Sequence, residues 1–426
     1  MFAPPAARRG RAASATALMF ALLFAVGDVH AQSRDELPQP LRAQDVVRFV
    51  RAHRAEVTAS QARARAAEQR PDIVSALPDP MVMVSADHIP FSLMGLDGSV
   101  MVQQDFPLSG ILGARRRAAE AGAREMRTRV SQTSLDVELD ALRAFYMLGG
   151  ARRLVQVFED QIVAATQLRQ AAIARYAAGR GLQADVLRAE AEVSQWTARR
   201  ASLDGDIQAS EAMLNAALGR EAELPVPALD ADVRDEDPPS VRELVAAAVT
   251  SRPELAAMRS AQQRARAEID VMRAMYAPMA FVRTGPSITM SDGPGVMLMV
   301  GVSVPIWRSR LAAGVEEARA MSAMTDAEVI AMRTMIEGDA LVARGSIVSA
   351  RSRWRVLHEQ VEPLARQSFV ATISGYAAGQ LPMVSVLEAL SMLRMAQEER
   401  IMAAVARATG WARLSRATGR SVQVGQ

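Results

Sequence analysis

The sequence predicts a mainly α-helical chain in which long helical hairpins and a short pair of strands occur twice. The first observation is composition: half of the 426 residues are apolar, but only 4% are aromatic. Abundant Ala, Arg, Leu, Glu and Met favour long helices over a compact mixed core. The second observation is an internal repeat, and the third is a stretch without proline from Pro107 to Pro225.

The composition also excludes several classes of chemistry. The chain has no cysteine and four histidines, and all 50 of its basic residues are arginine. It therefore has no disulfide scaffold, no thiol nucleophile, no cysteine-based zinc site and no Walker A lysine. No Ser/His/Asp grouping or paired catalytic carboxylates stand out. We expect a protein that is not an enzyme and that uses no cofactor and no resident metal ion.

The N-terminal segment has the three parts of a secretory signal peptide. Arg8, Arg9 and Arg11 precede an uncharged apolar run from Ala12 to Val26, and small residues surround His30 before a cleavage point after Ala31. The run is too short for a membrane-spanning helix. We predict that residues 1–31 are a signal peptide and that the mature chain is exported. Without this segment the formal charge is close to zero, so nothing indicates nucleic-acid binding.

Comparison of the chain with itself shows a tandem duplication. His53–Val57 aligns with Ser251–Leu255 at an offset of 198 residues, and Tyr176–Gly179 matches Tyr376–Gly379 at an offset of 200. An acidic, proline-rich stretch separates the halves and is typical of a linker. The predicted organisation is a first repeat at 32–229, a linker at 230–239, a second repeat at 240–420 and a tail at 421–426.

Each repeat is expected to begin with one helix, which is followed by two strands. The first helices are predicted at 41–70 and 241–275, the second with Ser240 as its N-cap. The strands are predicted at 81–89, 99–106, 280–289 and 295–304, each pair being joined by a Gly- and Asp-rich turn.

A very long helical stretch follows each pair of strands. In the first repeat, Leu135, Leu139, Leu142, Tyr146 and Gly149 alternate in steps of four and three, which is the spacing of a coiled-coil seam. The stretch from 114 to 176 would be roughly 95 Å long as a helix. A turn then reverses the chain, and a second helix returns.

The strands have the length that a tilted strand needs to cross a bilayer. Four strands cannot close a membrane barrel, and an open sheet edge is not tolerated in lipid. The strands therefore either form soluble hairpins or contribute to one barrel shared by several chains. In the second case Trp307, just after the last strand, would be an aromatic anchor at the membrane–water interface.

The two reversals carry a recognisable motif. Tyr176-Ala-Ala-Gly179 is followed six residues later by Asp185-Val-Leu, and Tyr376-Ala-Ala-Gly379 by Ser385-Val-Leu. With the exported start and the duplicated halves, these turns resemble the TolC-like outer membrane efflux proteins, the outer membrane factors of tripartite efflux systems. The resemblance covers about residues 41–420.

That resemblance implies a fold, a location and partners. Three identical chains would form a 12-stranded outer-membrane β-barrel in contact with lipid, continued by a periplasmic α-barrel of long helical hairpins. The homotrimer would be a passive duct that exports metal ions or drugs, supplied by a periplasmic membrane-fusion adaptor and an inner-membrane pump of the RND type. The alternative is a soluble periplasmic coiled-coil scaffold or interaction protein.

The resemblance also implies roles for residues at the turns. Asp185 and Tyr376 would latch the periplasmic entrance, whereas Ala184 and Leu381 replace the partners of a second latch. Ser385 and Glu388 occupy the positions of two entrance acids, so a single acidic ring is expected. Gly179 and Gly379, which we expect to end their helices in a left-handed conformation, would mark the tips that contact the adaptor.

The 24 methionines suggest a further possibility. Thioethers are soft ligands that suit Cu(I), and the pairs Met81/Met83 and Met297/Met299 each place two side chains on one face of a strand. The alternative is that methionine fills irregular packing or faces lipid. The methionine content favours the heavy-metal branch of the family.

Overall fold

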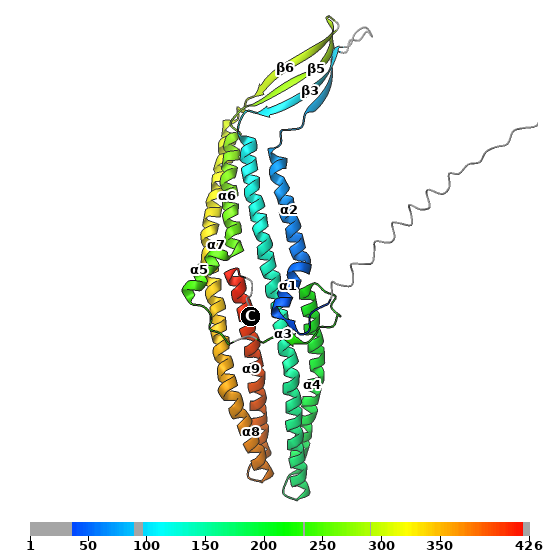
Figure 1. Cartoon of the computed structure of the whole chain (residues 1–426), viewed down its shortest axis with the longest axis vertical. Helices are drawn as coiled ribbons and strands as arrows, with labels where there is room; N and C mark the ends of the chain where they lie inside the picture. The colour runs from blue at the N-terminus through cyan, green and yellow to red at the C-terminus, as the bar shows by residue number, and fades with distance from the viewer. Residues whose placement is uncertain (1–35, 89–96, 233–234, 290, 421–426) are drawn as a thin grey trace, which may run out of the picture.

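The computed structural model describes residues 36–88, 97–232, 235–289 and 291–420. The predicted signal peptide at 1–31 and the tail at 421–426 lie outside the described residues. The molecule is elongated: a β-sheet occupies one end, two helical reversals occupy the other, and long helices connect them (Figure 1). The expected combination of long helices with four longer strands is present.

The halves have their helices in the same order, except that a π-helical turn divides the long helix of the second half into two. The first half contains α1 (Ala43–His53), α2 (Ala55–Ser75), α3 (Ile111–Ala177) and α4 (Gln183–Leu218). The second half contains α5 (Val241–Ser251), α6 (Pro253–Ala274), α7 (Arg308–Val356), the π-helix η1 (Leu357–Val361), α8 (Glu362–Ala377) and α9 (Met383–Thr418).

Two shorter helices stack along each long helix. In the first half, α2 packs on the sheet end of α3 and α4 on the opposite end; in the second, α6 and α9 pack in the same way along α7 and α8 (Figure 1). The coiled-coil seam predicted in α3 is buried: Leu142 and Tyr146 are 1% and 3% exposed. They lie in a core cluster with α1, α4 and α9. The two halves also contact each other through α3, α6 and α9.

The prediction of one first helix in each repeat is wrong. The chain leaves helical geometry at Arg54 and at Arg252, where ψ is 124° and 122°, so each segment forms two helices. The side chain of Arg54 donates to the backbone oxygen of Ala216 in the last turn of α4. Arg252 donates to Asp339 of α7 at 2.8 Å. These contacts and the extended residues redirect the chain between α1 and α2 and between α5 and α6.

A left-handed glycine completes each of these joints. Gly219 ends α4 with φ of 77° and lies against Arg54, while Gly419 ends α9 with φ of 66° and lies against Arg252. A Cβ on Gly419 would come within 2.5 Å of the Ser251 carbonyl oxygen, so this position admits no side chain. The C-terminus of α4 therefore meets the N-terminus of α2, and the C-terminus of α9 meets the N-terminus of α6.

The long helix of the second half is not regular throughout, contrary to the prediction. The π-helical turn at 357–361 lies immediately before Pro363 of α8. Proline has no N–H to donate to the preceding turn, and its ring crowds the carbonyl four residues earlier. A widened turn at this point accommodates the ring without ending the helix. The predicted N-cap Ser240, by contrast, is confirmed, with its hydroxyl accepting from the Glu243 N–H.

The four longer strands form one antiparallel sheet of order β2-β3-β5-β6. They are β2 (Met81–His88), β3 (Asp97–Pro107), β5 (Met279–Thr289) and β6 (Gly293–Ser303). The halves join where β3 pairs with β5, from Gly98 opposite Ile288 to Pro107 opposite Met279. Within the described residues, β2 and β6 are the two edges of the sheet. A small parallel pair, β1 (Leu41–Arg42) with β4 (Leu229–Asp230), was not predicted.

The stretch between the halves has a structural role beyond connection. Asp235 accepts hydrogen bonds from Arg351 at 2.6 Å, Arg355 at 3.0 Å and Arg407 at 3.2 Å. The guanidinium of Arg407 also lies 4.3 Å from the ring centroid of Trp354. Hydrogen bonds from Arg351 and then Arg355 lower the pKa of Asp235 from 3.8 to about 2. One linker carboxylate therefore ties α7 to α9.

We expect Asp235→Asn to lower the free energy of unfolding by about 1 kcal/mol at neutral pH, a value reduced by solvent screening of this half-exposed group. Because the folded pKa is depressed, the stabilisation is complete above the unfolded pKa and disappears as the pH falls toward 2. Thermal unfolding of parent and variant should therefore converge with acidification. Asp232→Asn, which changes an 85% exposed carboxylate nearby, should have a smaller effect at every pH.

Candidate functional site

The first candidate region is the pair of reversals at the end opposite the sheet. One joins α3 to α4 and the other joins α8 to α9 (Figure 1). Gly179 and Gly379 have φ of 67° and 81°, which confirms the predicted left-handed helix ends. Their N–H groups each donate to the carbonyl of the tyrosine three residues earlier, at 2.9 Å. The two turns therefore close in the same way.

The structure brings Asp185 and Tyr376 together across the two halves. Tyr376 is 1% exposed, and its hydroxyl donates to Asp185 Oδ2 at 3.2 Å. Asp185 lies in the first turn of α4, where a carboxylate is also favoured by the helix dipole. Burial raises the pKa of Tyr376, and the charge and hydrogen bond of Asp185 raise it further. The phenol therefore keeps its proton and remains a donor at neutral pH.

Arg175, in the last turn of α3, is a further cross-repeat contact that the sequence analysis missed. Its Nη1 donates to the Tyr376 carbonyl oxygen at 2.6 Å, and its guanidinium carbon lies 4.5 Å from the centroid of the Tyr376 ring. Its Nη2 donates to the Arg180 carbonyl within its own turn. One signal was visible: the repeat offset of 200 places Gly375 at the corresponding position, so the halves differ just before the shared tyrosine.

Apart from Ala184 in α4, the remaining predicted turn residues lie on the α8–α9 hairpin. Leu381 packs its side chain against Gly375, where an added Cβ would come within 2.7 Å of Leu381 Cδ1. Ala184 and Leu381 have no polar side-chain atoms, so they cannot form the second latch. Ser385 is partly buried in the first turn of α9, and Glu388 is exposed less than one turn later. The structure does not bring Glu388 to the Asp185–Tyr376 contact.

The second candidate region is the sheet, whose two faces differ in composition. Hydrogen bonds from Arg283 to Gln103 at 2.7 and 3.1 Å and between Ser85 and Ser99 at 2.7 Å define one face, which we call the inner face. Valine and leucine side chains alternate onto the opposite, outer face, where Val84 is 78% and Val296 80% exposed. The outer face carries Val82, Val84, Val100, Val102, Val282, Val296, Leu298, Val300 and Val302.

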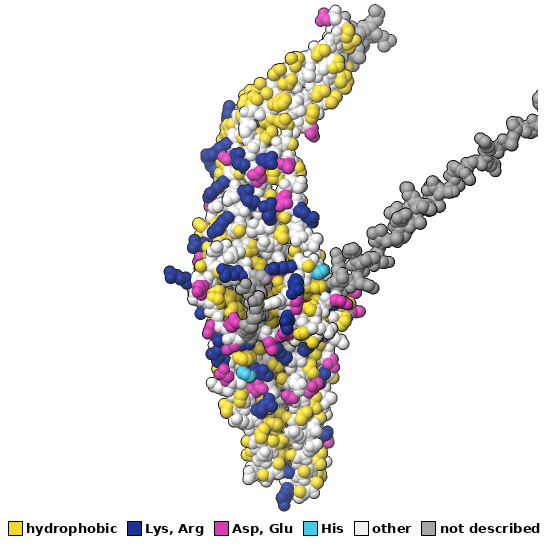
Figure 2. Space-filling model, in the orientation of Figure 1, with side chains coloured by type: hydrophobic (Ala, Val, Ile, Leu, Met, Phe, Trp, Pro, Cys, Tyr) yellow, Lys and Arg dark blue, Asp and Glu magenta, His cyan; other side chains and the backbone are white. Residues whose placement is uncertain are grey.

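Trp307 lies where the sheet meets the helices. It is the N-cap residue of α7 and is 70% exposed. The next residue, Arg308, places its guanidinium 5.6 Å from the ring centroid of Tyr276, which follows α6. Aromatic and arginine side chains thus gather at the base of the sheet. Figure 2 shows the change from the largely hydrophobic sheet to the charged helical body below it.

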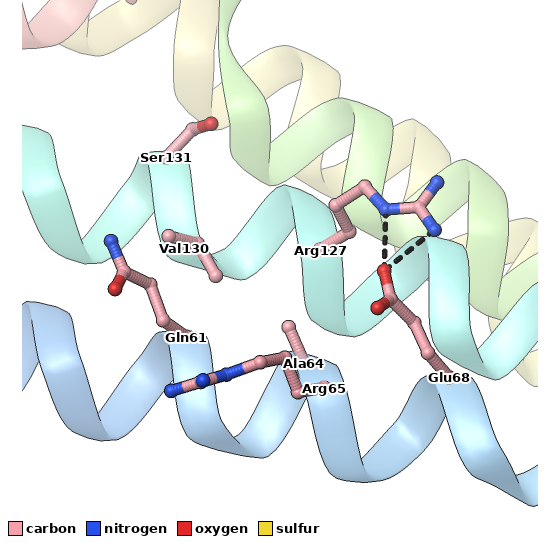
Figure 3. Close-up of a pocket in the computed structure, with 7 residues that line it drawn as sticks. All are labelled: Gln61, Ala64, Arg65, Glu68, Arg127, Val130 and Ser131. Carbon is pink, nitrogen blue, oxygen red and sulfur yellow. Dashed lines mark hydrogen bonds and ion pairs between the residues drawn. The ribbon is translucent and has the colours of Figure 1, made fainter.

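A groove of about 560 Å³ lies between α2 and α3 (Figure 3). Glu68 Oε1 accepts hydrogen bonds from Nη2 and Nε of Arg127 at 2.7 and 3.0 Å, which joins the two helices at one end of this groove. In the part of the chain that the structure describes, no three His, Cys, Asp or Glu side chains are grouped to hold a metal ion. None of the described helices is both long and apolar enough to cross a membrane.

Comparison with solved structures identifies the architecture. The chain matches the outer-membrane channel OprN with a TM-score of 0.75 at 17% identity, over 89% of this chain and 90% of that one. It matches VceC of Vibrio cholerae with a TM-score of 0.75 at 15% identity, over 89% and 96%. CusC gives a TM-score of 0.76 at 14% identity, over 89% and 92%.

No family model matches the sequence, and no curated protein is detectably similar to it. The likeness to these channels therefore lies in the arrangement of helices and strands and not in the amino-acid sequence. It confirms the expected mainly helical architecture of long hairpins with a small β part. The chain has the fold of the TolC-like outer-membrane channels.

Proposed function

We propose that this protein is the outer membrane channel of a tripartite efflux system, a passive duct from the periplasm to the exterior. The observation that carries the proposal is a two-faced sheet with open edges at the end of a long helical body. An outer face of exposed valine suits lipid, and the inner face suits a water-filled interior. The likeness to solved outer-membrane channels supports the same reading.

The open edges support a homotrimer. Unpaired strand edges are not tolerated in a bilayer, so β2 and β6 need partners from other copies. Three copies of the four-stranded sheet would supply the 12 strands of one barrel. In that assembly, Trp307 would be placed at the membrane–water interface, where aromatic side chains are enriched.

The tips are the proposed periplasmic entrance. Gly179 and Gly379 lie in the turns of the two hairpins, at the end of the molecule opposite the sheet. A periplasmic adaptor and an inner-membrane RND pump would dock at this end. We propose that Asp185, Tyr376 and Arg175 hold the two hairpins of one chain together and so restrain opening. The proposed cargo is metal ions or drugs.

The shared barrel predicts a strong difference between neighbouring positions of β6. Val300 is on the outer face and Met299 on the inner face. Val300→Arg should destabilise the membrane-embedded trimer by about 2–4 kcal/mol, because it places a charge in lipid. Met299→Arg should destabilise the trimer much less, because its charge would face the water-filled interior. Cross-linking of detergent-solubilised protein should end at a trimer for the parent and for Met299→Arg; a parent that stays monomeric would favour the scaffold alternative.

The entrance is expected to open in two steps. Tyr376→Phe removes only the hydroxyl and its charge-assisted hydrogen bond, which contributes on the order of 1 kcal/mol per chain at this partly buried site. The contacts of Arg175 with the ring and the carbonyl remain. Adding Arg175→Ala should therefore increase single-channel conductance well beyond Tyr376→Phe alone, whereas adding Asp185→Asn should change little. Arg188→Ala, at an exposed position of α4, is the control. A double variant indistinguishable from Tyr376→Phe would remove Arg175 from the gate.

We propose that Glu388, exposed near the start of α9, forms a ring of three carboxylates at the entrance. Such a ring favours cations by its field, and polyvalent cations should bind it and reduce the current. Glu388→Ala should weaken that block and leave trimer yield unchanged. Glu190→Ala, an exposed carboxylate on the other hairpin, is the matched change. Identical block of parent and Glu388→Ala would place the carboxylate outside the conducting path.

A further inference from the structure

We infer that the inner face of the sheet binds soft monovalent metal cations, Cu⁺ or Ag⁺, through methionine thioethers that line the exit of the duct. The inference rests on the proposed channel only in placing this face toward the interior. The thioether site itself follows from the register of the strands. The cation is cargo held transiently, not a resident cofactor.

The methionines of the sheet are sorted by face. Strand register places every methionine of the described longer strands on the inner face, together with Gln103 and Arg283: Met81, Met83, Met101, Met279, Met297 and Met299. Every valine of the same strands is on the outer face. If methionine served only as an apolar filler, the two residue types would be mixed. Their separation places all the thioether sulfur atoms of these strands on the face that we propose lines the interior.

Two of these methionines face each other on neighbouring strands, and a third lies on the opposite edge strand. Met83 of β2 is directly opposite Met101 of β3, so their Cβ atoms are about 4.5–5.5 Å apart. Met297 of β6 is opposite Gly285, whose Cα position lies so close to Met101 that an added Cβ would be 2.8 Å from Met101 Cα. Because glycine has no side chain, nothing of β5 separates Met101 from Met297. Through its long, flexible side chain, Met101 can share an ion with Met83 on one side or with Met297 on the other. Met83 and Met297 are on opposite edge strands, about 14 Å apart, and cannot share one ion.

The preference for a soft ion comes from the thioethers, because the inner face also carries oxygen groups such as Asp105, which accepts a hydrogen bond from Gln103 at 2.8 Å. Thioether sulfur is uncharged and binds Cu⁺ and Ag⁺, whereas Ca²⁺, Mg²⁺ and Na⁺ need oxygen ligands. Arg283 is on the same face, held by Gln103 and stacked 5.6 Å from the Phe281 centroid. Its fixed positive charge opposes every cation, and only a soft cation gains a compensating bond from the thioether sulfur. Weak, repeated thioether contacts at several positions allow an ion to bind and also to leave.

The test is Ag⁺ binding to the full-length protein in detergent, measured by equilibrium dialysis. The test variant is Met83→Leu/Met101→Leu/Met297→Leu, which conserves volume and apolarity but removes the sulfur atoms. The matched control is Met321→Leu/Met324→Leu/Met335→Leu, which removes three exposed methionines of α7. We expect the sheet variant to lose at least tenfold in affinity at the tightest Ag⁺ site and the control to retain it. X-ray absorption of the Ag⁺-loaded parent should show a sulfur shell.

The outcomes are distinguishable from those of the channel proposal. Equal Ag⁺ binding by the parent, the sheet variant and the control would overturn the inference, as would a parent without an Ag⁺ site. In planar bilayers, Ag⁺ should reduce the parent current and leave the sheet variant at least tenfold less sensitive. If the parent binds Ag⁺ through the sheet but conducts nothing, the channel proposal fails and the metal site stands. If the parent conducts normally but binds no Ag⁺ through the sheet, the metal site fails and the channel proposal stands.

Discussion

The architecture depends on one packing constraint: a helix of 67 residues needs a partner along its whole length. An apolar stripe left exposed over half of that length would favour aggregation over a defined fold. The chain solves this by stacking two shorter helices end to end on each long helix, and the two joints at Arg54–Gly219 and Arg252–Gly419 make the stacking possible. The sheet and the tips are held apart at fixed separation because these composite columns are continuous.

Local features of the sequence were sufficient for much of this fold. The absence of proline between Pro107 and Pro225, the Ser240 cap and the left-handed Gly179 each act within a few residues, and each appears as predicted. The break at Arg54 has no local signal, because Ala55 and its neighbours are good helix formers. The break depends on contact with Ala216 in α4, which only the folded chain brings near.

The same distinction applies to the functional residues. Asp185 and Tyr376 were identified because each belongs to a turn motif, and the structure shows them in contact. Arg175 was missed since its partners are the carbonyl and ring of a residue 201 positions away. The spacing of two residues along a strand was enough to place Met81 and Met83 on one face of their strand, and Met297 and Met299 on one face of theirs. Only the register across the four strands shows that both pairs share the inner face with Met101.

The π-helical turn at 357–361 makes the two halves mechanically unequal. The α3–α4 hairpin is continuous with the unbroken helix α3. The α8–α9 hairpin follows the π-helical turn, where each backbone hydrogen bond spans one residue more than in an α-helix. Such a turn is a compliant element in an otherwise stiff rod. A force applied at the tips would therefore bend the second leg before the first. The two hairpins, although similar in their sequence layout, would then respond differently to the same force: the first would stay straight and the second would bend.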